Sequence, residues 1–457
     1  MANKNHNKQN ILLLIASYFF YACWDYRFLF LLVFSTLLDY FSGIIIYKSQ
    51  NLKTKRLWLW SSIGINLGFL FFFKYFNFFI SSFDDVISNL GFHFDSWTLK
   101  IILPIGISFY TFHGLSYVID IYYDKIKPEK NFINYSVFVS FFPLLVAGPI
   151  ERATHLLPQI QRKREFNYTR AVDGLRQILW GLFKKIVIAD NCAEYVNLIF
   201  NDSAHQSGST LAFGAFLFAF QIYCDFSGYS DIALGTARLF GIDLLRNFAF
   251  PYFSRDIAEF WRRWHISLTT WFRDYVYIPL GGSKLGKWIK VRNTFVIFLV
   301  SGFWHGANWK FLVWGFLNAL YFLPLLLLNK NRINVTTVAQ GKLFPSVKEV
   351  VQIFITFTFT VFAWIFFRAN SITQALLYIQ GIFNKSLFSK PTIFPVILMG
   401  LLLFFITIEW MGRENQYAIE RLGFKWPKTI RVSFYYLLIV LIFLFMGKEQ
   451  EFIYFQF

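Results

Sequence analysis

Two histidines stand in segments where a histidine is uncommon. His305 lies in the middle of the apolar run FLVSGFWHGANWKFLVWGF (298–316), and His265 lies in the aromatic and basic run FWRRWHISLTTWFRDYVYIPLGG (260–282). Desolvation keeps an imidazole neutral, and the lone pair of the neutral ring can accept a proton near pH 7. Each ring is therefore a candidate general base. The alternative is a structural role, in which neighbouring groups satisfy a buried ring.

Other catalytic chemistries have less support in the sequence. No G-x-S-x-G pattern of a serine hydrolase occurs. No histidine has an aspartate five positions after it, which is the pair that soluble glycerolipid acyltransferases use. The 3 cysteines and 7 histidines show no metal-ligand spacing, so we expect no metal site and no disulfide framework. A histidine base that acts without a covalent serine is the simplest chemistry that remains.

Polar residues also gather in two further apolar runs. His113 and Asp120 interrupt residues 103–125, together with Pro104, Gly106 and Gly114. Asp225, Asp231 and Arg238 lie within 221–248. Ionisable residues at membrane depth are costly and often mark functional sites. A kinked span explains the first group equally well. We interpret Arg238 as a structural contact between helices and keep Asp225 as a candidate binding residue.

The composition is that of a membrane protein. Of 457 residues, 56% are hydrophobic and 15% are charged, whereas a soluble chain has roughly a quarter charged residues. A helix needs about 20 apolar residues to cross the bilayer, and only helices suit runs of this length. Strong candidates are 27–47, 57–80, 211–224, 292–304, 311–328, 351–367, 393–410 and 431–446; weaker ones are 10–24, 100–123, 133–150 and 173–200. We predict an all-α polytopic protein with about eleven to thirteen transmembrane or re-entrant helices. Residues 1–457 are expected to form a single membrane-embedded domain.

The net charge of +18 fits short basic loops at the cytoplasmic side better than nucleic-acid binding. The basic clusters lie at 48–56, 162–164 and 284–292, next to apolar runs, and we expect the first and third to be cytoplasmic. The run ILLLIASYFF (11–20) is followed by bulky aromatics and not by a small-residue cleavage site. It is therefore predicted to be a retained helix and not a signal peptide.

The segment that contains His265 is expected to lie in the interface. Aromatic residues and His265 recur at helical spacing over 257–278, and Arg262, Arg263, Arg273 and Asp274 lie between them. This pattern predicts one amphipathic helix, ended by Pro279 and the Gly281–Gly282 turn. Its charges are too costly at mid-depth, so we expect that it does not cross the bilayer.

Several motifs, in order along nearly the whole chain, resemble those of the membrane-bound O-acyltransferases. They are most similar to the branch that contains the membrane subunit of alginate O-acetyltransferase. The motifs are LPIGISFYTFHGLSYVIDIYY (103–123), FFPLLVAGPIER (141–152), YCDFSGYSDIALGTARLFG (223–241), the two histidine segments, WIFFRANSITQALLYI (364–379) and the terminal FIYFQF (452–457). Family members usually carry another apolar helix before residue 11, so the resemblance leads us to expect a longer or alternative N-terminus.

The resemblance implies a ring of tilted helices around a central tunnel, in a bacterial plasma (inner) membrane. By motif, His305 corresponds to the essential histidine and His265 to the second, upstream polar position. Candidate substrate-binding residues around them are Asn308, Trp304, Arg262, Asp225 and Trp261. The implied donor is acetyl-CoA or another acyl thioester from the cytoplasm, with no tightly bound cofactor.

The family also implies what lies on the far side of the membrane. There a separate partner of the serine-hydrolase-like type is expected to pass acetyl to an exported polysaccharide. Alternatives within the fold are peptidoglycan O-acetylation and D-alanylation of teichoic acid. A multi-pass transporter that uses Asp225, Asp231 and Arg238 is the alternative from another class. The transporter has less support because matching inverted halves are not visible in the sequence.

Overall fold

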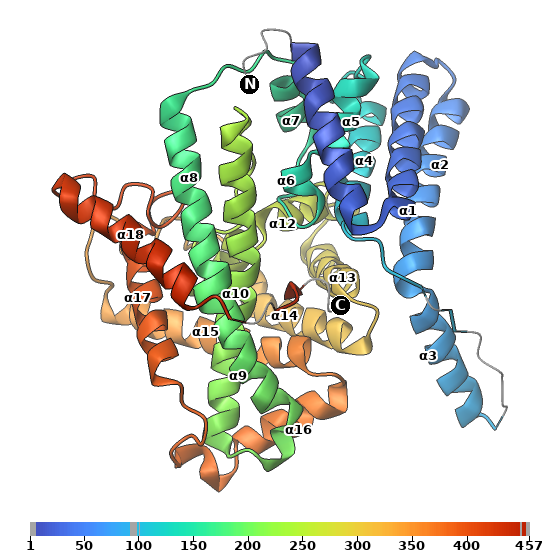
Figure 1. Cartoon of the computed structure of the whole chain (residues 1–457). Coiled ribbons are helices and arrows are strands. Elements are labelled where there is room, and N and C mark those ends of the chain that lie inside the picture. The colour runs from blue at the N-terminus through green and yellow to red at the C-terminus, as the bar shows by residue number, and fades with distance from the viewer. Residues whose placement is uncertain (1–5, 92–97, 100, 448–449, 454–457) are drawn as a thin grey trace. The chain divides into compact units, whose positions relative to one another are not determined.

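The computed structural model describes residues 6–91, 98–99, 101–447 and 450–453, so the last four residues of the terminal motif lie outside it. Within these ranges the regular structure is helical and no strand occurs. The chain groups into two compact units (Figure 1). Unit 1 covers residues 1–171 and 236–245, and unit 2 covers 172–235 and 246–457. The single domain over 1–457 stays a prediction.

Unit 1 is a bundle in which α1, α2, α4 and α5 lie side by side (Figure 1). The two predicted runs 10–24 and 27–47 form one helix, kinked at Asp25, where the backbone leaves helical geometry at φ −158°. The predicted span 133–150 is wrong as a continuous helix, because Phe141 adopts ψ 110° and separates α5 from the short α6. The elements are α1 (His6–Lys48), α2 (Leu52–Leu70), η1 (Phe71–Tyr75), α3 (Phe76–Asn89), α4 (Ile107–Tyr122), α5 (Phe132–Ser140), α6 (Phe142–Leu145) and α7 (Ala153–Ile160).

A buried polar network connects α1 and α2, and α4 packs against it. Asp39 on α1 accepts hydrogen bonds from Ser62 Oγ at 2.7 Å and Asn66 Nδ2 at 2.9 Å, both on α2. Ser35 donates to Asn66 Oδ1 at 2.6 Å. A Cβ at Gly114 on α4 would lie 1.9 Å from Asp39 Oδ2, so glycine is needed for α4 to pack against this carboxylate. In the sequence, Gly114 was one of the residues that interrupt the apolar run 103–125. In the structure, it allows α4 to pack closely against α1.

In unit 2, α8 packs closely against α10. A Cβ at Gly181 would lie 2.6 Å from Gly228 O, and one at Gly235 would lie 2.4 Å from Gly174 O. The main elements are α8 (Tyr168–Leu182), η2 (Phe183–Ala189), α9 (Asp190–Asn201), η3 (Ser203–His205), α10 (Gly208–Leu239), η4 (Pro251–Phe253), α11 (Ile257–Arg263), α12 (Ile266–Phe272), η5 (Arg273–Tyr277), α13 (Lys287–His305), α14 (Trp309–Leu327), α15 (Val347–Arg368), α16 (Ile372–Ile382), η6 (Lys385–Phe388), α17 (Val396–Gly412) and α18 (Lys428–Leu444).

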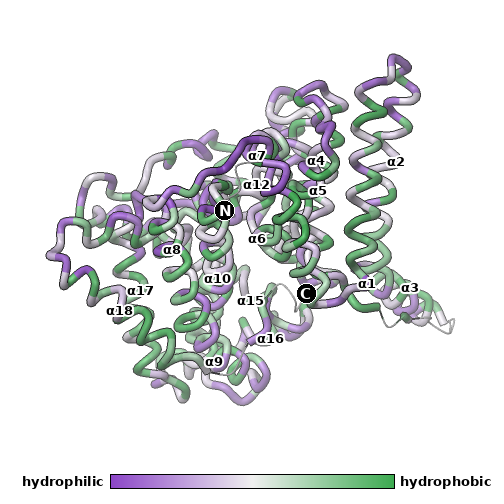
Figure 2. The backbone as a smooth tube through the Cα atoms, turned by 45° about the horizontal axis from the view of Figure 1, so that its top comes forward, coloured by the Kyte–Doolittle hydropathy of each residue, from purple (hydrophilic) through white to green (hydrophobic). Residues whose placement is uncertain are grey.

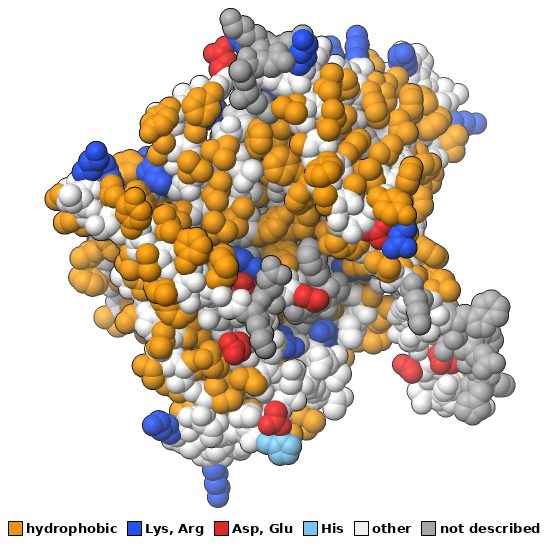
Figure 3. Space-filling view, viewed as in Figure 1, with side chains coloured by type: hydrophobic (Ala, Val, Ile, Leu, Met, Phe, Trp, Pro, Cys, Tyr) orange, Lys and Arg blue, Asp and Glu red, His pale blue; other side chains and the backbone are white. Residues whose placement is uncertain are grey.

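The hydropathy of these helices is that of a multi-pass membrane protein. Within the described ranges, five helical stretches are long and apolar enough to cross a bilayer: His6–Lys48, Leu52–Asn89, Gly208–Leu239, Trp309–Leu327 and Val347–Arg368. Hydrophobic residues line much of α2, with hydrophilic ones at its N-terminal end (Figure 2). Phe30 on α1 and Trp60 on α2 are 75% and 66% exposed, where lipid would cover them. Hydrophobic side chains cover much of the face shown in Figure 3. The predicted all-helical membrane fold is confirmed, whereas the higher helix count, the ring and the tunnel stay predictions.

Candidate active site

The helix predicted over 257–278 is broken at His265, so the prediction of one continuous helix is wrong. α11 ends at Arg263, and α12 begins at Ile266. His265 between them adopts the left-handed conformation, φ 42° and ψ 54°. A non-glycine residue in this region costs about 1–3 kcal/mol, and such residues cluster at functional sites.

The preceding extended segment supplies the reason for the break. The Asn247 carbonyl accepts a hydrogen bond from Ile266 N at 2.9 Å, and Ala249 N donates to Arg263 O at 2.9 Å. These two bonds take the place of intrahelical partners, so the backbone can turn at His265 without leaving these groups unsatisfied. The sequence pattern of 257–278 could not show them, because their partners lie outside it.

The His265 ring is held by polar and aromatic neighbours. Its Nδ1 lies 3.0 Å from Asn247 Oδ1, and its ring meets the ring of Phe226 on α10 edge to face at 4.7 Å. The side chain is buried and lies outside the five candidate spanning helices. Burial lowers the pKa of His265 well below its ordinary value, and the nearby His305 adds to this effect. His265 is therefore neutral near pH 7.

His305 is the last residue of α13 and is held by ring packing. The rings of Trp314 and Phe367 meet it with their centroids 5.3 Å and 5.4 Å away. Three glycines let α13 and α14 approach each other closely at this point. A Cβ at Gly302 would lie 2.2 Å from Phe311 O, one at Gly306 would lie 2.1 Å from the Phe311 ring, and one at Gly315 would lie 2.3 Å from Phe298 O.

Both histidines line one cavity of about 360 Å³ in unit 2. Its lining includes the apolar residues Trp261, Trp264, Leu268, Phe272, Phe298 and Phe322. It also includes four cations, Arg262, Arg273, Lys290 and Arg332. A neutral imidazole in an apolar chamber can act as a general base, and cations suit an anionic ligand. The arrangement thus fits proton transfer on a substrate with an anionic portion.

The predicted binding residues fall into three places. Trp261 and Arg262 line the cavity. Trp304 is half-buried on α13, and Asn308 caps α14 by accepting a hydrogen bond from Lys310 N at 3.0 Å. Asp225 is buried away from this cavity's lining, where it pairs with Lys185 Nζ at 2.8 Å and accepts from Ile453 N at 2.8 Å. The roles of these residues, and of both histidines, stay predictions.

The other polar residues singled out in the sequence have identifiable partners. His113, in unit 1, accepts a hydrogen bond from Glu151 N through Nε2 at 3.1 Å. Asp120 pairs with Lys125 Nζ at 2.9 Å. In unit 2, Asp231 pairs with Lys184 Nζ at 2.5 Å. These contacts are of the kind that stabilise helix packing.

Sequence reasoning missed several residues near the histidines. Ser301 lines the cavity one helical turn before His305 on α13, and the i, i+4 spacing could have pointed to it. Lys290, which the sequence placed only in a basic cluster, and Arg332 also line the cavity. Asn247 lies 18 positions before its partner His265, and no periodic pattern connects them.

Comparisons with known proteins point to one family. The model of the MBOAT, membrane-bound O-acyltransferase family matches residues 123–367, which include both histidines. A peptidoglycan O-acetyltransferase of Helicobacter pylori is 33% identical over 99% of this chain and 92% of its own. A probable alginate O-acetylase of Pseudomonas putida is 33% identical over 98% and 94%. A teichoic acid D-alanyltransferase of Streptococcus thermophilus is 29% identical over 63% and 70%.

Proposed function

The chain belongs to the membrane-bound O-acyltransferase family, and from this premise we propose that it moves acetyl groups across a bacterial plasma membrane for O-acetylation of an exported polysaccharide of the alginate type. The donor is a cytoplasmic acyl thioester, and the acceptor is a hydroxyl group on the far side. The observation that carries the proposal is the cavity that His265 and His305 line together.

His305 is the proposed general base. The acceptor oxygen attacks the thioester carbonyl carbon while His305 takes the hydroxyl proton. A C–O bond forms, the C–S bond of the tetrahedral intermediate breaks, and the leaving thiolate takes the proton from the imidazolium. No net proton is consumed. His265 orients a substrate in the same cavity and contributes less to the proton transfer.

The cations of the cavity support a donor that carries phosphate, such as acetyl-CoA. Arg262, Arg273, Lys290 and Arg332 lie on its wall, and Lys290 belongs to the basic cluster expected on the cytoplasmic side. The apolar wall has room for a small acyl group and its thioester. The bulky anionic portion of the donor would stay with the cations while the acyl group reaches the histidines.

The acceptor side involves a second protein. A serine-hydrolase-like partner outside the membrane takes the acetyl group on its nucleophile and passes it to the polymer. Two proteins are expected to share the reaction, because the polymer lies outside the membrane and the thioester lies inside the cell. The membrane subunit then needs a route only for the acyl group.

Peptidoglycan is a second candidate for the final acceptor. The observation that favours it is the peptidoglycan O-acetyltransferase of Helicobacter pylori, which matches 99% of this chain at 33% identity. The D-alanyltransferase of Streptococcus thermophilus matches only 63% of the chain, so D-alanylation has less support.

Labelled acyl transfer would test the proposal. Membranes that contain the chain and its partner are incubated with acetyl-CoA labelled in the acetyl group, and ester-linked label is measured in isolated exopolysaccharide and in isolated peptidoglycan. Label in the exopolysaccharide supports the proposal, and label in peptidoglycan alone supports the second candidate. Matched membranes with His305→Ala provide the control. Equal labelling with and without the chain would contradict both.

A further inference from the structure

The segment before α11 determines how the His265 ring is presented. Asn247 is 1% exposed, and three polar groups lie within hydrogen-bonding distance of its side-chain oxygen. Ser267 N lies 3.4 Å away, Ser267 Oγ 3.0 Å and His265 Nδ1 3.0 Å. A backbone N–H can only donate, so the atom that faces it is the amide oxygen and not the amide nitrogen.

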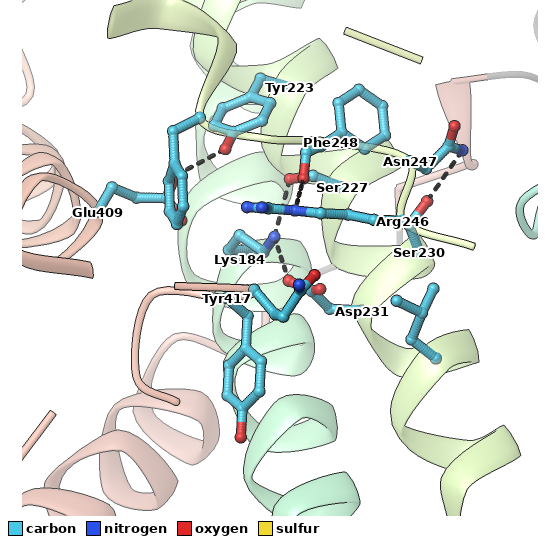
Figure 4. A pocket seen from close by; sticks show the side chains of 13 residues that line it. Lys184, Tyr223, Ser227, Ser230, Asp231, Arg246, Asn247, Phe248, Glu409 and Tyr417 are labelled. Carbon is cyan, nitrogen blue, oxygen red and sulfur yellow. Dashed lines mark hydrogen bonds and ion pairs between the residues drawn. The ribbon is translucent and has the colours of Figure 1, made fainter. Parts of the chain in front are cut away.

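The other end of the same amide points to α10. Asn247 Nδ2 donates to Ser230 Oγ at 3.4 Å (Figure 4). Ser227, one turn before Ser230 on α10, accepts a hydrogen bond from Lys184 Nζ of η2 at 3.0 Å. Lys184 also pairs with Asp231 of α10. The amide therefore lies between a charged cluster on one side and the His265 ring on the other. The Ser230 hydroxyl can donate or accept, so it is compatible with this orientation, which the Ser267 N–H determines.

An amide oxygen can only accept hydrogen bonds. The His265 nitrogen that faces it must therefore carry a proton, so the neutral ring is the Nδ1–H tautomer with its lone pair on Nε2. Asn247 does not line the cavity that His265 lines. The Nδ1 edge of the ring therefore faces Asn247, outside the cavity lining. This leaves Nε2 as the nitrogen that can contact a substrate in the cavity.

From this geometry we propose that Asn247 is a positioning residue that fixes the tautomer of His265 and so presents the Nε2 lone pair to the cavity. The catalytic consequence rests on the proposed acyltransferase function, in which His265 acts on a substrate in this cavity. The tautomer itself does not depend on that function.

The tautomer can be read directly by nitrogen NMR of the full chain in lipid nanodiscs, with ¹⁵N-labelled histidine. The difference between the wild type and His265→Gln identifies the His265 signals among those of the 7 histidines. We expect a protonated Nδ1 and an unprotonated Nε2 in the wild type, and a loss of this preference in Asn247→Ala. A protonated Nε2 in the wild type, or an unchanged tautomer in Asn247→Ala, would overturn the proposal.

Kinetics give the second readout. Asn247→Ala is expected to lower kcat of acetyl transfer about 10- to 100-fold, by analogy with the loss of a partner that orients a metal-bound histidine, with KM nearly unchanged. Asn247→Asp keeps an acceptor for Nδ1–H and should retain most activity. Its carboxylate stabilises the imidazolium, so the acid limb of the pH profile should move to higher pH. Burial and His305, which lower the pKa of His265, act in both proteins.

Asn318→Ala is the matched control. Asn318 is a buried asparagine on α14 whose Nδ2 donates to Trp314 O at 2.9 Å, and it does not line the cavity. Its loss should leave kcat and the pH profile unchanged per folded protein. Equal loss of kcat in Asn247→Ala and Asn247→Asp, without a pH shift, would show a merely structural role and overturn the proposal. A wild-type chain without acyl transfer would instead defeat the proposed function, and the NMR result would still decide the tautomer.

Discussion

The two histidines of the cavity are held in different ways. Hydrogen bonds and a left-handed backbone hold His265 between two short helices, whereas ring packing holds His305 at the end of a long helix. A hydrogen bond fixes the ring plane and also the position of the proton. Ring contacts, such as those of Trp314 and Phe367 with His305, restrict the plane of the ring. Under the proposed function, His305 exchanges protons and His265 orients a substrate.

The supports of the two rings also come from different parts of the sequence. His305 is held by α14, which follows it directly, and by Phe367 on α15. His265 is held by a segment that precedes it and by Phe226 on α10. Mutations that loosen one ring should therefore leave the other in place, which allows the two roles to be separated.

The largest effect is expected from His305. His305→Ala should lower acetyl transfer about 10²- to 10⁴-fold, because a positioned acid or base typically contributes that much, while protein amount and membrane insertion stay near normal. The labelled-acetyl assay measures the loss. His305→Gln keeps a hydrogen-bonding group of similar volume but cannot act as a base, and it should be nearly as inactive. Near wild-type transfer by His305→Gln at equal protein level would refute a proton-transfer role.

His265→Ala should cost less than His305→Ala and leave measurable activity. An orienting residue lowers the fraction of productive complexes, but the base that moves the proton remains. The same assay compares the two variants at equal protein level. The control is His113→Ala in unit 1, whose ring accepts a backbone hydrogen bond from Glu151. It should lower the amount of folded protein more than the activity per folded molecule. If His265→Ala were the more damaging of the two cavity variants, the roles would have to be exchanged.

The comparison also explains what the sequence could and could not predict. Composition and run length predicted the helical membrane fold, because apolar length alone decides which segments can cross a bilayer. His305 could be singled out because it stands in an apolar run. The break at His265 could not be predicted, because helical spacing continues through 257–278 and the partners that interrupt it lie at 247–249. Asp225, kept as a candidate binding residue, does not line the histidine cavity and pairs with Lys185 of another helix, and sequence spacing does not show such a partner.

The packing of α13 on α14 offers a test of the His305 support. In Gly306→Ala the new Cβ would lie 2.1 Å from the Phe311 ring, so that ring must move, and it packs against Phe367 beside His305. Overpacking of this kind costs about 1–3 kcal/mol, and we expect roughly a tenfold loss of transfer. Phe311→Leu in the same chain makes room and should restore most of it.

A glycine with open space around it serves as the control for this substitution. Gly400 on α17 has nothing within 4 Å of an added Cβ, so Gly400→Ala should leave the transfer rate unchanged. If Phe311→Leu failed to rescue Gly306→Ala, the glycine would be needed for something other than contact with this ring, and the packing account of His305 would be incomplete.

The smallest expected effect is the pH dependence of stability that His265 contributes. Burial lowers the pKa of this histidine in the folded chain, whereas in the unfolded chain it titrates near pH 6.5. Above that pH both states hold a neutral ring, and the full stability is present. As the pH falls from 6.5 through the lowered pKa, the unfolded state binds a proton that the folded state does not, so stability is lost.

His265→Gln removes this contribution. The Tm of the purified chain in detergent should therefore fall less between pH 7.5 and pH 5.5 in His265→Gln than in the wild type, by about 1–3 °C. An equal fall in both proteins would mean that the pKa of His265 in the folded chain is close to its unfolded value, as for a ring exposed to solvent. A smaller fall in the wild type than in His265→Gln would mean that the folded ring is already charged. Either result would contradict a buried, neutral His265.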